Sequence, residues 1–557
     1  MNRAKLIFIM LLLIGCRVTT AAATRCETLA TESDNGIVGN PEIKSATSAI
    51  VSGPGEKIAY CRVSLVYGTN PNQNINIVVG LPLNAADGGT GGIQGAWNGR
   101  TEGLGDSACS GNLDVTPAVN AGYVGSGTDL GHPDGNCEPA VNPDGTYNLQ
   151  FIDDFIRNAI KQQVLWSKKI AQAYYGARPA FNYWNGCSTG GREGYLLAQE
   201  LGDELNGILA DAPAIYLTRF HTAQMWGQIV MKSLVGGPIA PAKLAQARAS
   251  AVAACDAADG VTDGIIDDPR TCRFDATANI CGSPTAPASN CLTPEEARAI
   301  NLIWDGPHNE RDDKIWFGLD RGSDFSILDG PAPFPTGVTQ FHWNEHDRNF
   351  DWRMVRLDEY PRIAQDGSRN IADLTDTFGS LDIFRAHGGK LLTYVGGNDQ
   401  FIFPHGVISY YRTMALRYSQ TDDPDFDNLQ RFYRLFRAPG VGHCGIGSAG
   451  PVPLDPFGAL VKWVEEGVAP DMLLAAGGSA APPSGRTRPI CPYPTTAIYN
   501  GSGSIDDAAN FHCGGNLEQP GAVCDDALVK YKHEEHGKLD FSAWGLERES
   551  CRFVQPR

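Results

Sequence analysis

Two motifs in this chain each place a cysteine beside a residue that can carry out acyl transfer. Ser188 lies in Gly186-Cys187-Ser188-Thr189-Gly190, which fits the G-x-S-x-G pattern of a serine nucleophile, and Cys444 directly follows His443. A disulfide requires Cα atoms within about 7 Å of each other. If Cys187 and Cys444 are bonded, the backbones at Ser188 and His443 are held together although they are far apart in the sequence. A serine and a histidine that close are a nucleophile and its general base, which predicts a serine hydrolase.

Asp399 supplies the third residue of a catalytic triad. It ends the run Gly396-Gly397-Asn398-Asp399, and the order Ser188, Asp399, His443 is that of α/β-hydrolases. In that chemistry the serine attacks an ester carbonyl, the histidine transfers the proton to the leaving alcohol, and the aspartate holds the imidazole in the correct tautomer. Taken singly, each residue has a plainer explanation, since Gly-Gly-Asn-Asp also suits an ordinary turn. Together, in this order and with both cysteines, they favour the triad.

The elements around these residues predict an α/β-hydrolase fold with a large inserted lid domain. Residues 180–184 have the pattern of a strand and 191–201 that of a helix, so Ser188 lies at a strand–turn–helix junction, the context of a nucleophile elbow. Asp399 and His443 follow two further strand-like runs. The predicted divisions are a first core part at 24–216, a lid at 217–380, a second core part at 381–513 and a C-terminal extension at 514–557.

Size and charge limit the function further. The chain has 557 residues, which exceeds the usual size of one compact core, and its net charge is -18. Nucleic-acid binding depends on clustered positive charge, and this sequence has no basic run. We therefore expect no nucleic-acid partner.

Residues 1–23 predict an export signal. Positive charge at 2–5 precedes a short apolar run at 6–14, too short to span a bilayer, and no other stretch predicts a membrane span. Two cleavage sites remain open: Leu13-Ile14-Gly15-Cys16 is typical of a lipoprotein whose Cys16 is lipidated, whereas Ala21-Ala22-Ala23 suits an ordinary signal peptidase. Of the 15 cysteines, an even number remains after Cys16, which favours a disulfide-rich periplasmic or secreted protein.

These motifs resemble the tannase/feruloyl esterase family, whose hallmark is a Cys-Ser…Asp…His-Cys constellation with the two cysteines bridged. The resemblance extends from about Cys26 to Cys513 and includes residues 97–100, 128–132, 186–192, 488–494 and 501–509. It implies hydrolysis of aromatic carboxylic esters, namely feruloyl or related hydroxycinnamoyl esters, galloyl esters or terephthalate monoesters. Nothing in the sequence separates these three acids.

The resemblance also implies an oxyanion hole and several disulfides. The loop at Gly105 would supply one backbone N–H and Thr189 the other, although the loop reads Gly105-Asp106-Ser107-Ala108-Cys109 where relatives often have a run of glycines. The acid loop also lacks a tryptophan common in relatives. By analogy the further bridges are Cys26–Cys61, Cys281–Cys291 and Cys491–Cys513, and elimination leaves Cys109–Cys137 and Cys524–Cys551.

Residues 255–268 form an acidic loop with five aspartates. Such a density of hard oxygen ligands suits Ca²⁺, although no Glu follows at the EF-hand position, and a solvated acidic turn closed by Cys255–Cys272 fits equally on chemistry alone. The resemblance implies a structural calcium site in the lid. Its ligands would be the side chains of Asp256, Asp259 and Asp263 and the carbonyls of Val261 and Ile265.

The lid also carries Arg353, Arg356 and Arg362 near Trp352. One of these could pair with a substrate carboxylate or phenol, but we favour the simpler interpretation that they are surface arginines. A different class of function is an exported, catalytically weak protein that binds plant phenolics, suggested only by the altered loop at Asp106 and Ser107. A peptidase on the same fold is a third alternative. The triad and the C-terminal motifs favour the esterase.

Overall fold

The structure is a computed structural model that describes residues 24–518 and a short hairpin. Within 24–518 it leaves out 33–35, 53–57, 313, 331, 368–370, 372–374, 376–378, 422 and 478–484, and the hairpin pairs β15 (Lys532–His533) with β16 (Leu539–Asp540). The predicted signal, both cleavage alternatives with Cys16, and the Cys524–Cys551 pairing lie outside the described residues. Across the described part of the chain, no helix is long and apolar enough to cross a membrane.

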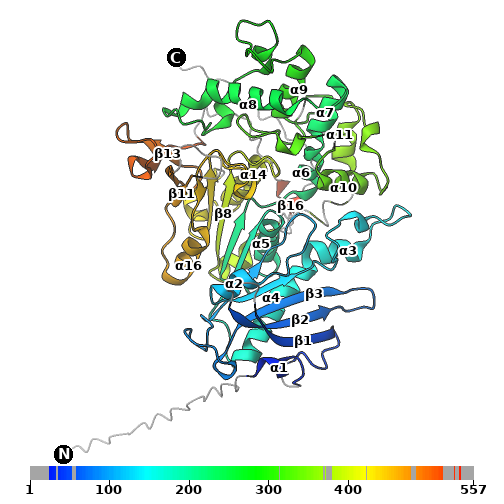
Figure 1. Ribbon diagram of the computed structural model, residues 1–557, viewed down its shortest axis with the longest axis vertical. Coiled ribbons are helices and arrows are strands. Elements are labelled where there is room, and N and C mark those ends of the chain that lie inside the picture. The colour runs from blue at the N-terminus through cyan, green and yellow to red at the C-terminus, as the bar shows by residue number, and fades with distance from the viewer. Residues whose placement is uncertain are drawn as a thin grey trace, which may run out of the picture.

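A nine-stranded sheet forms the centre of the molecule, with strand order β1-β2-β3-β5-β4-β6-β7-β8-β9 (Figure 1). The first three strands and the β3–β5 pair are antiparallel, and the pairs from β5 to β9 are parallel. Parallel strands end at the same edge of a sheet, so the loops after β6, β8 and β9 lie close together. The bounds are β1 (Ile43–Ser52), β2 (Ala59–Tyr67), β3 (Ile75–Pro82), β4 (Arg100–Leu104), β5 (Val124–Thr128), β6 (Phe181–Cys187), β7 (Gly207–Asp211), β8 (Lys390–Gly396) and β9 (Tyr433–Ala438).

Helices cover both faces of this sheet. On one face α4 (Ala159–Tyr175) and α5 (Thr189–Glu200) pack against β3 to β7, and on the other α16 (Pro456–Glu466) contacts β7 and β8 (Figure 1). Because Ile160 and Val164 of α4 recur at helical spacing, they face the sheet together and are buried. Each such side chain contributes about 1.5–3 kcal/mol by burial. The core helices also include α1 (Cys26–Leu29), α2 (Thr116–Asn120), α3 (Leu149–Asp153), α14 (Pro404–Arg417) and α15 (Phe426–Leu429).

The predicted lid falls in the long connection between β7 and β8. Figure 1 shows its helices in green, at the end of the sheet where the parallel strands terminate. Within it, the N-terminus of α9 is stabilised by a reciprocal capping box between Thr293 and Glu296. The helices of this connection are α6 (Leu217–Gln224), α7 (Trp226–Val235), α8 (Pro241–Cys255), α9 (Pro294–Asp305), α10 (Pro335–Asn344), α11 (Tyr360–Arg362) and α13 (Asp382–Ala386), of which α13 contacts α5 of the core.

The segment after α16 connects the core to the acidic loop of the lid. It contributes β11 (Leu473–Ala476) and β12 (Thr487–Ile490) to a three-stranded sheet whose other strand, β10 (Val452–Pro453), precedes α16, and it forms a hairpin, β13 (Thr496–Tyr499) with β14 (Phe511–Gly514). From β12 and the residue before it, Arg488 and Arg486 form ion pairs with Asp263. The lid is thus attached to the core at a second place besides its chain ends.

Candidate active site

Ser188 occupies the sharp turn between β6 and α5. Its backbone, with φ 62° and ψ −120°, is in a region that residues other than glycine rarely adopt. The turn can close because Gly186 and Gly190 lack side chains: a Cβ on Gly186 would lie 2.5 Å from the Gly190 carbonyl carbon. The Ser188 N–H donates to the Asp211 carbonyl at 3.0 Å, and the Ser188 carbonyl accepts from Arg192 and Ala214, each at 3.0 Å. These bonds stabilise a strained conformation that presents the hydroxyl at the end of the sheet.

His443 and Asp399 are in direct contact. His443 Nδ1 lies 2.8 Å from Asp399 Oδ2, and Asp399 is 1% exposed. The other carboxylate oxygen accepts the N–H groups of Phe401 and Ile402, each at 2.9 Å. Gln400 Oε1 accepts the His443 N–H at 3.2 Å. The acid is therefore fixed in orientation, and Nε2 remains the nitrogen available for proton transfer.

The Cys187–Cys444 disulfide links the serine turn to the histidine turn. The Cα atoms of the two cysteines are 6.1 Å apart, and Cys444 has φ 49°. Among the described residues there is no hydrogen bond between Ser188 Oγ and His443. Such catalytic hydrogen bonds are often long in unliganded enzymes and shorten in the substrate complex. The disulfide is the covalent connection that keeps the two residues adjacent.

Removing this disulfide should reduce activity more than stability. We expect Cys187→Ser/Cys444→Ser to lower kcat about 100-fold, since a misplacement of about 1 Å has that effect on a reacting pair. A matched control is Cys26→Ser/Cys61→Ser, which removes a buried disulfide between α1 and β2. The control should lower the melting temperature but leave kcat within about twofold. Equal loss of kcat in both double variants, measured at a temperature where both are folded, would contradict the aligning role.

Five further disulfides form within the described residues. They are Cys26–Cys61, Cys109–Cys137, Cys255–Cys272, Cys281–Cys291 and Cys491–Cys513. Every one of these pairings agrees with the sequence analysis, including the pair that rested on elimination alone. So many disulfides fit a protein that folds in an oxidising compartment, as exported proteins do.

The two predicted oxyanion donors, the N–H groups of Thr189 and Gly105, differ in whether they are already hydrogen-bonded. Thr189 is the first residue of α5, so its N–H is one of the amides that a helix leaves without an intrahelical acceptor. The prediction for Gly105 is wrong, because its N–H donates to the Asn185 carbonyl at 2.9 Å and continues the β4–β6 ladder. The next amide is occupied as well, since the Asp106 N–H donates to Glu193 Oε2 at 3.1 Å. For the Thr189 amide, the oxyanion role stays a prediction.

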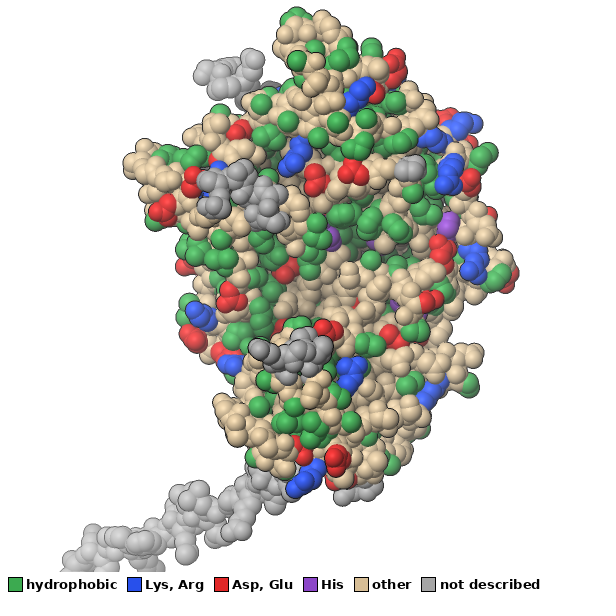
Figure 2. All heavy atoms as spheres, viewed as in Figure 1, with side chains coloured by type: hydrophobic (Ala, Val, Ile, Leu, Met, Phe, Trp, Pro, Cys, Tyr) green, Lys and Arg blue, Asp and Glu red, His purple; other side chains and the backbone are tan. Residues whose placement is uncertain are grey.

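Apolar side chains lie next to the triad. The Phe401 ring is 5.4 Å from the His443 ring, and the half-buried Phe334 of the lid is 4.8 Å from Phe401. Figure 2 shows apolar side chains gathered across the middle of this face of the molecule, between its upper and lower parts. The surroundings of His443 therefore suit a substrate with an apolar or aromatic part.

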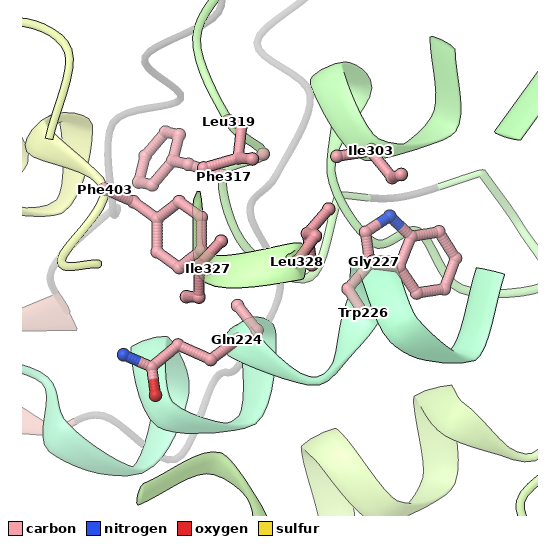
Figure 3. A pocket seen from close by; sticks show the side chains of 11 residues that line it. Gln224, Trp226, Gly227, Ile303, Phe317, Leu319, Ile327, Leu328 and Phe403 are labelled. Atoms are coloured by element: carbon pink, nitrogen blue, oxygen red, sulfur yellow. The ribbon is translucent and has the colours of Figure 1, made fainter. Parts of the chain in front are cut away.

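An apolar pocket of the lid is connected to the acid loop through Gln224. Figure 3 shows Phe317, Ile327, Leu328 and Phe403 around this pocket, with Gln224 on α6 at its edge. Gln224 Nε2 donates to the Phe401 carbonyl at 2.9 Å, and Thr336 Oγ1 donates to Gln224 Oε1 at 2.7 Å. Gln224 could not be predicted from the sequence, since no motif surrounds it.

The three lid arginines are on the surface and paired. Arg353 binds Asp351 at 3.1 Å and Arg362 binds Glu345 at 3.1 Å, and Arg356 pairs with Asp358. All three side chains are more than half exposed. This arrangement agrees with their interpretation as surface arginines and gives none of them a place beside His443.

The acidic loop is folded around the Asp256 carboxylate. Its oxygens accept the N–H groups of Asp263, Gly264 and Ile265. Burial, followed by the charges of Asp259 and Asp263, raises the pKa of Asp267 to about 8. Among the residues that the structure describes, no group of three or more acidic, histidine or cysteine side chains is arranged as a metal site.

Comparison with known proteins agrees with this geometry. The profile of the family "Tannase and feruloyl esterase" matches residues 88–330 and 334–514. A probable feruloyl esterase of Arthroderma benhamiae is 32% identical over 83% of this chain and 87% of its own length. An uncharacterized esterase of Xanthomonas campestris pv. campestris is 30% identical over 92% of this chain and 95% of its own.

Solved structures show the same fold. Feruloyl esterase B from Aspergillus oryzae superposes with a TM-score of 0.72 at 24% identity, covering 88% of this chain and all of its own. Tannin acyl hydrolase from Aspergillus niger gives a TM-score of 0.73 at 22% identity, covering 85% of this chain and 92% of its own. With the family profile and the sequence relatives, these findings show that the chain belongs to the tannase and feruloyl esterase family and is a carboxylic ester hydrolase.

Proposed function

We propose that this protein is an exported serine esterase that hydrolyses esters of aromatic carboxylic acids through an acyl-enzyme on Ser188. The observation that carries the proposal is the disulfide between the neighbours of Ser188 and His443, together with the 2.8 Å contact of His443 with Asp399. Acyl transfer requires a nucleophile and a base held close together. Here the serine is at a strained turn, a buried carboxylate orients the histidine, and a disulfide links the two turns.

The chemistry follows from the positions of these groups. His443 Nε2 removes the proton from Ser188 Oγ as the oxygen attacks the ester carbonyl, and the developing oxyanion is stabilised by the Thr189 N–H. His443 then gives the proton to the leaving alcohol, which frees the product and leaves an acyl ester on Ser188. A water molecule, activated by the same imidazole, attacks this ester and releases the carboxylic acid. Asp399 stabilises the imidazolium at both stages.

The proposed substrate class rests on the aromatic surroundings of His443 and on the named activities of relatives. Phe401 lies beside the imidazole and Phe334 packs against Phe401, which gives an apolar surface where a planar ring can pack with its edge or face toward it. We would supply purified protein with methyl ferulate, methyl gallate, a terephthalate monoester and a short p-nitrophenyl ester. Turnover of one aromatic ester, absent in Ser188→Ala, is the expected result. Turnover of the p-nitrophenyl ester alone would contradict the aromatic specificity, and turnover of no ester would favour the phenolic-binding protein.

A structural calcium ion is the second part of the proposal. The ligands would be the side chains of Asp256, Asp259 and Asp263 with the carbonyls of Val261 and Ile265, all hard oxygen donors. Burial, then the charge of Asp263 among the neighbouring groups, raises the pKa of Asp259. Arg486 and Arg488 pair with Asp263, and a divalent cation would neutralise the negative charge of the other aspartates in the loop. The ion would fix the lid loop and would take no part in the acyl transfer.

Calcium removal should therefore lower stability. A ligand that binds only the folded protein adds about 2.7 kcal/mol at a concentration 100-fold above its dissociation constant, so EDTA should lower the melting temperature and excess calcium should restore it. Asp259→Asn should lose this response. Asp275→Asn should keep the calcium response, because Asp275 is a nearby lid aspartate that accepts the Thr277 N–H and is not one of the proposed ligands. A melting temperature indifferent to EDTA and calcium would contradict the site.

Export and the possible lipid at Cys16 complete the proposal. The disulfides support folding outside the cytoplasm. Mass spectrometry of the mature N-terminus distinguishes a lipidated Cys16 from cleavage after Ala23. A mature protein that retains residues 1–15 would contradict both cleavage alternatives.

A further inference from the structure

The loop that follows β4 is attached to the first turn of α5 by three hydrogen bonds. We call residues 105–108 the β4 loop. The Gly190 N–H donates to the Asp106 carbonyl at 2.9 Å, and Thr189 Oγ1 donates to the Ala108 carbonyl at 2.8 Å. In the opposite direction, the Asp106 N–H donates to Glu193 Oε2 at 3.1 Å. The β4 loop therefore bears directly on the residues that follow Ser188.

The contact is also close at the backbone level. A Cβ on Gly190 would lie 2.8 Å from Gly105 Cα. No space is left for the β4 loop to shift without moving α5 or separating from it. The position of the Thr189 N–H, which is the predicted oxyanion donor, thus depends on how the β4 loop is held.

Two buried carboxyl groups meet at this contact. Asp106 is 3% exposed and Glu193 is fully buried. Asp106 Oδ1 accepts the Asn112 N–H at 2.5 Å, whereas Oδ2 is buried and no donor reaches it. A carboxylate oxygen buried without a donor is unfavourable, but a protonated one is itself a donor and needs only an acceptor. The nearby acceptor is Glu193, whose Oε2 already receives the Asp106 N–H and whose carboxylate interacts with that of Asp106.

The local charge supports one proton for the pair. The fully buried Arg192 lies beside Glu193, with Nη2 3.5 Å from Oε1, and also donates to the Ile156 carbonyl at 2.9 Å. One guanidinium neutralises one carboxylate, so the group is neutral only if the other carboxyl keeps its proton. Burial, followed by the charge of Glu193, raises the pKa of Asp106 well above its usual range, and burial raises that of Glu193 to about 7.

We propose that Asp106 and Glu193 share one proton in a carboxyl–carboxylate hydrogen bond, and that this pair positions the β4 loop against the nucleophile turn. The two are positioning residues, because they act through the backbone of the β4 loop and of Thr189. Loss of the shared proton leaves two negative charges beside one fixed positive charge in a buried site. The β4 loop then separates from α5, the oxyanion donor loses its support, and kcat falls while KM changes little.

The direction of the pH effect follows from the raised pKa values. Glu193, whose pKa is raised to about 7, ionises first and leaves one proton on the pair, held by Asp106. Because the pKa of Asp106 is raised well above its usual range, the stabilising contribution of this proton is present at low pH and is lost as pH rises through that raised pKa. Arg192 faces the pair from α5, and its own pKa is lowered by burial and, to a smaller extent, by the charge of Arg157. His221 on α6 stays neutral in this range because burial lowers its pKa to about 3. Activity should therefore show an alkaline limb that these carboxyls control.

Glu102 is the alternative source of such a limb. Burial raises its pKa to about 7, within the tested pH range, and it accepts a hydrogen bond from Asn185 Nδ2 at 2.9 Å. It contacts neither Asp106 nor Glu193 by any hydrogen bond among the described residues. Glu102→Gln is thus a matched control that removes a buried carboxyl of similar pKa without touching the pair.

The test is the dependence of kcat on pH from 5 to 9 for the wild type, Asp106→Asn, Glu193→Gln and Glu102→Gln, with circular dichroism at each pH. We expect kcat of the wild type and of Glu102→Gln to fall about tenfold per pH unit above the transition, with the fold intact. Asp106→Asn keeps a donor toward Glu193 at every pH, so it should retain kcat within about tenfold at pH 6 and show no alkaline limb. Glu193→Gln should also lack the limb and provides a second variant if the first does not fold.

An unchanged limb in both variants of the pair, or its loss in Glu102→Gln, would overturn the inference, as would a wild type without any limb or one whose limb follows unfolding. The inference rests on the proposed role of Ser188. Residual turnover in Ser188→Ala would refute that role independently of these pH profiles.

Discussion

Ser188→Ala is expected to lower kcat about 10⁶-fold toward any ester that the wild type hydrolyses, since loss of the nucleophile removes the covalent step altogether. The fold should survive. The Ser188 bonds that stabilise the turn use its backbone N–H and carbonyl, which alanine retains. The remaining rate should come from substrate binding and the Thr189 amide alone. The measurement is kcat by product release, alongside the melting temperature.

Ser502→Ala is a suitable control for this variant. Ser502 is an exposed serine in the loop between β13 and β14, and its loss should leave kcat within about twofold. Turnover by Ser188→Ala above about 1% of the wild-type rate, after contaminating esterase has been excluded by repurification, would refute the assignment of Ser188 as nucleophile.

Asp399→Asn should give the second-largest loss, about 10⁴-fold in kcat. Asparagine fits the same space, but it places a neutral amide beside His443 Nδ1, which favours the wrong tautomer and removes the charge that stabilises the imidazolium. The carboxylate also accepts two backbone N–H groups, and an amide oxygen can keep that role. KM should therefore change little while kcat falls.

Asp320 of the lid and His405 of α14 provide a control with the same side-chain pair. Asp320 Oδ1 lies 2.8 Å from His405 Nε2, and both side chains are largely buried, with that of Asp320 11% exposed where that of Asp399 is 0% exposed. Asp320→Asn should leave kcat within about threefold. If Asp399→Asn lost less than tenfold, or if both variants lost activity equally at equal folding, Asp399 would be a structural residue and the triad would need another acid.

The sequence predicts the strand–turn–helix around Ser188 because its determinants are local. Gly186 and Gly190 permit the close turn, and apolar residues before and after it have strand and helix spacing. The approach of His443 could also be predicted, although it is distant in sequence, because a disulfide imposes a known distance on Cys187 and Cys444. The order of Ser188, Asp399 and His443 then indicates that the strands before these three residues end at the same edge of the sheet.

The oxyanion hole could not be predicted in the same way. Whether the Gly105 N–H is available depends on where the β4–β6 ladder ends, and the ladder continues to Asn185. Hydrogen-bond register is a property of the assembled sheet, and no local pattern encodes its last bond. The contact of Asp106 with Glu193 could not be predicted either, because it joins a loop to a helix and no sequence motif includes both residues.

The lid shows a third limit. Its arginines lie near a tryptophan in sequence, yet each pairs with an exposed or half-buried acidic residue of the lid, as surface arginines commonly do. Gln224, by contrast, bonds the Phe401 carbonyl beside the triad from a stretch with no distinguishing composition. Which lid residues lie at the site depends on how the lid packs on the core. That packing uses apolar contacts, which are too unspecific to be predicted from one sequence.

The most direct test of the account is the site of covalent labelling by a phosphonate ester that mimics the acylation transition state. Peptide mass spectrometry of the oxidised protein should place one label per molecule on Ser188, with loss of esterase activity in proportion to labelling, and Asp399→Asn should label far more slowly. A label on another residue, or full ester hydrolysis by protein whose Ser188 is completely modified, would contradict the claim that this serine, held beside His443 by the Cys187–Cys444 disulfide, forms the acyl-enzyme.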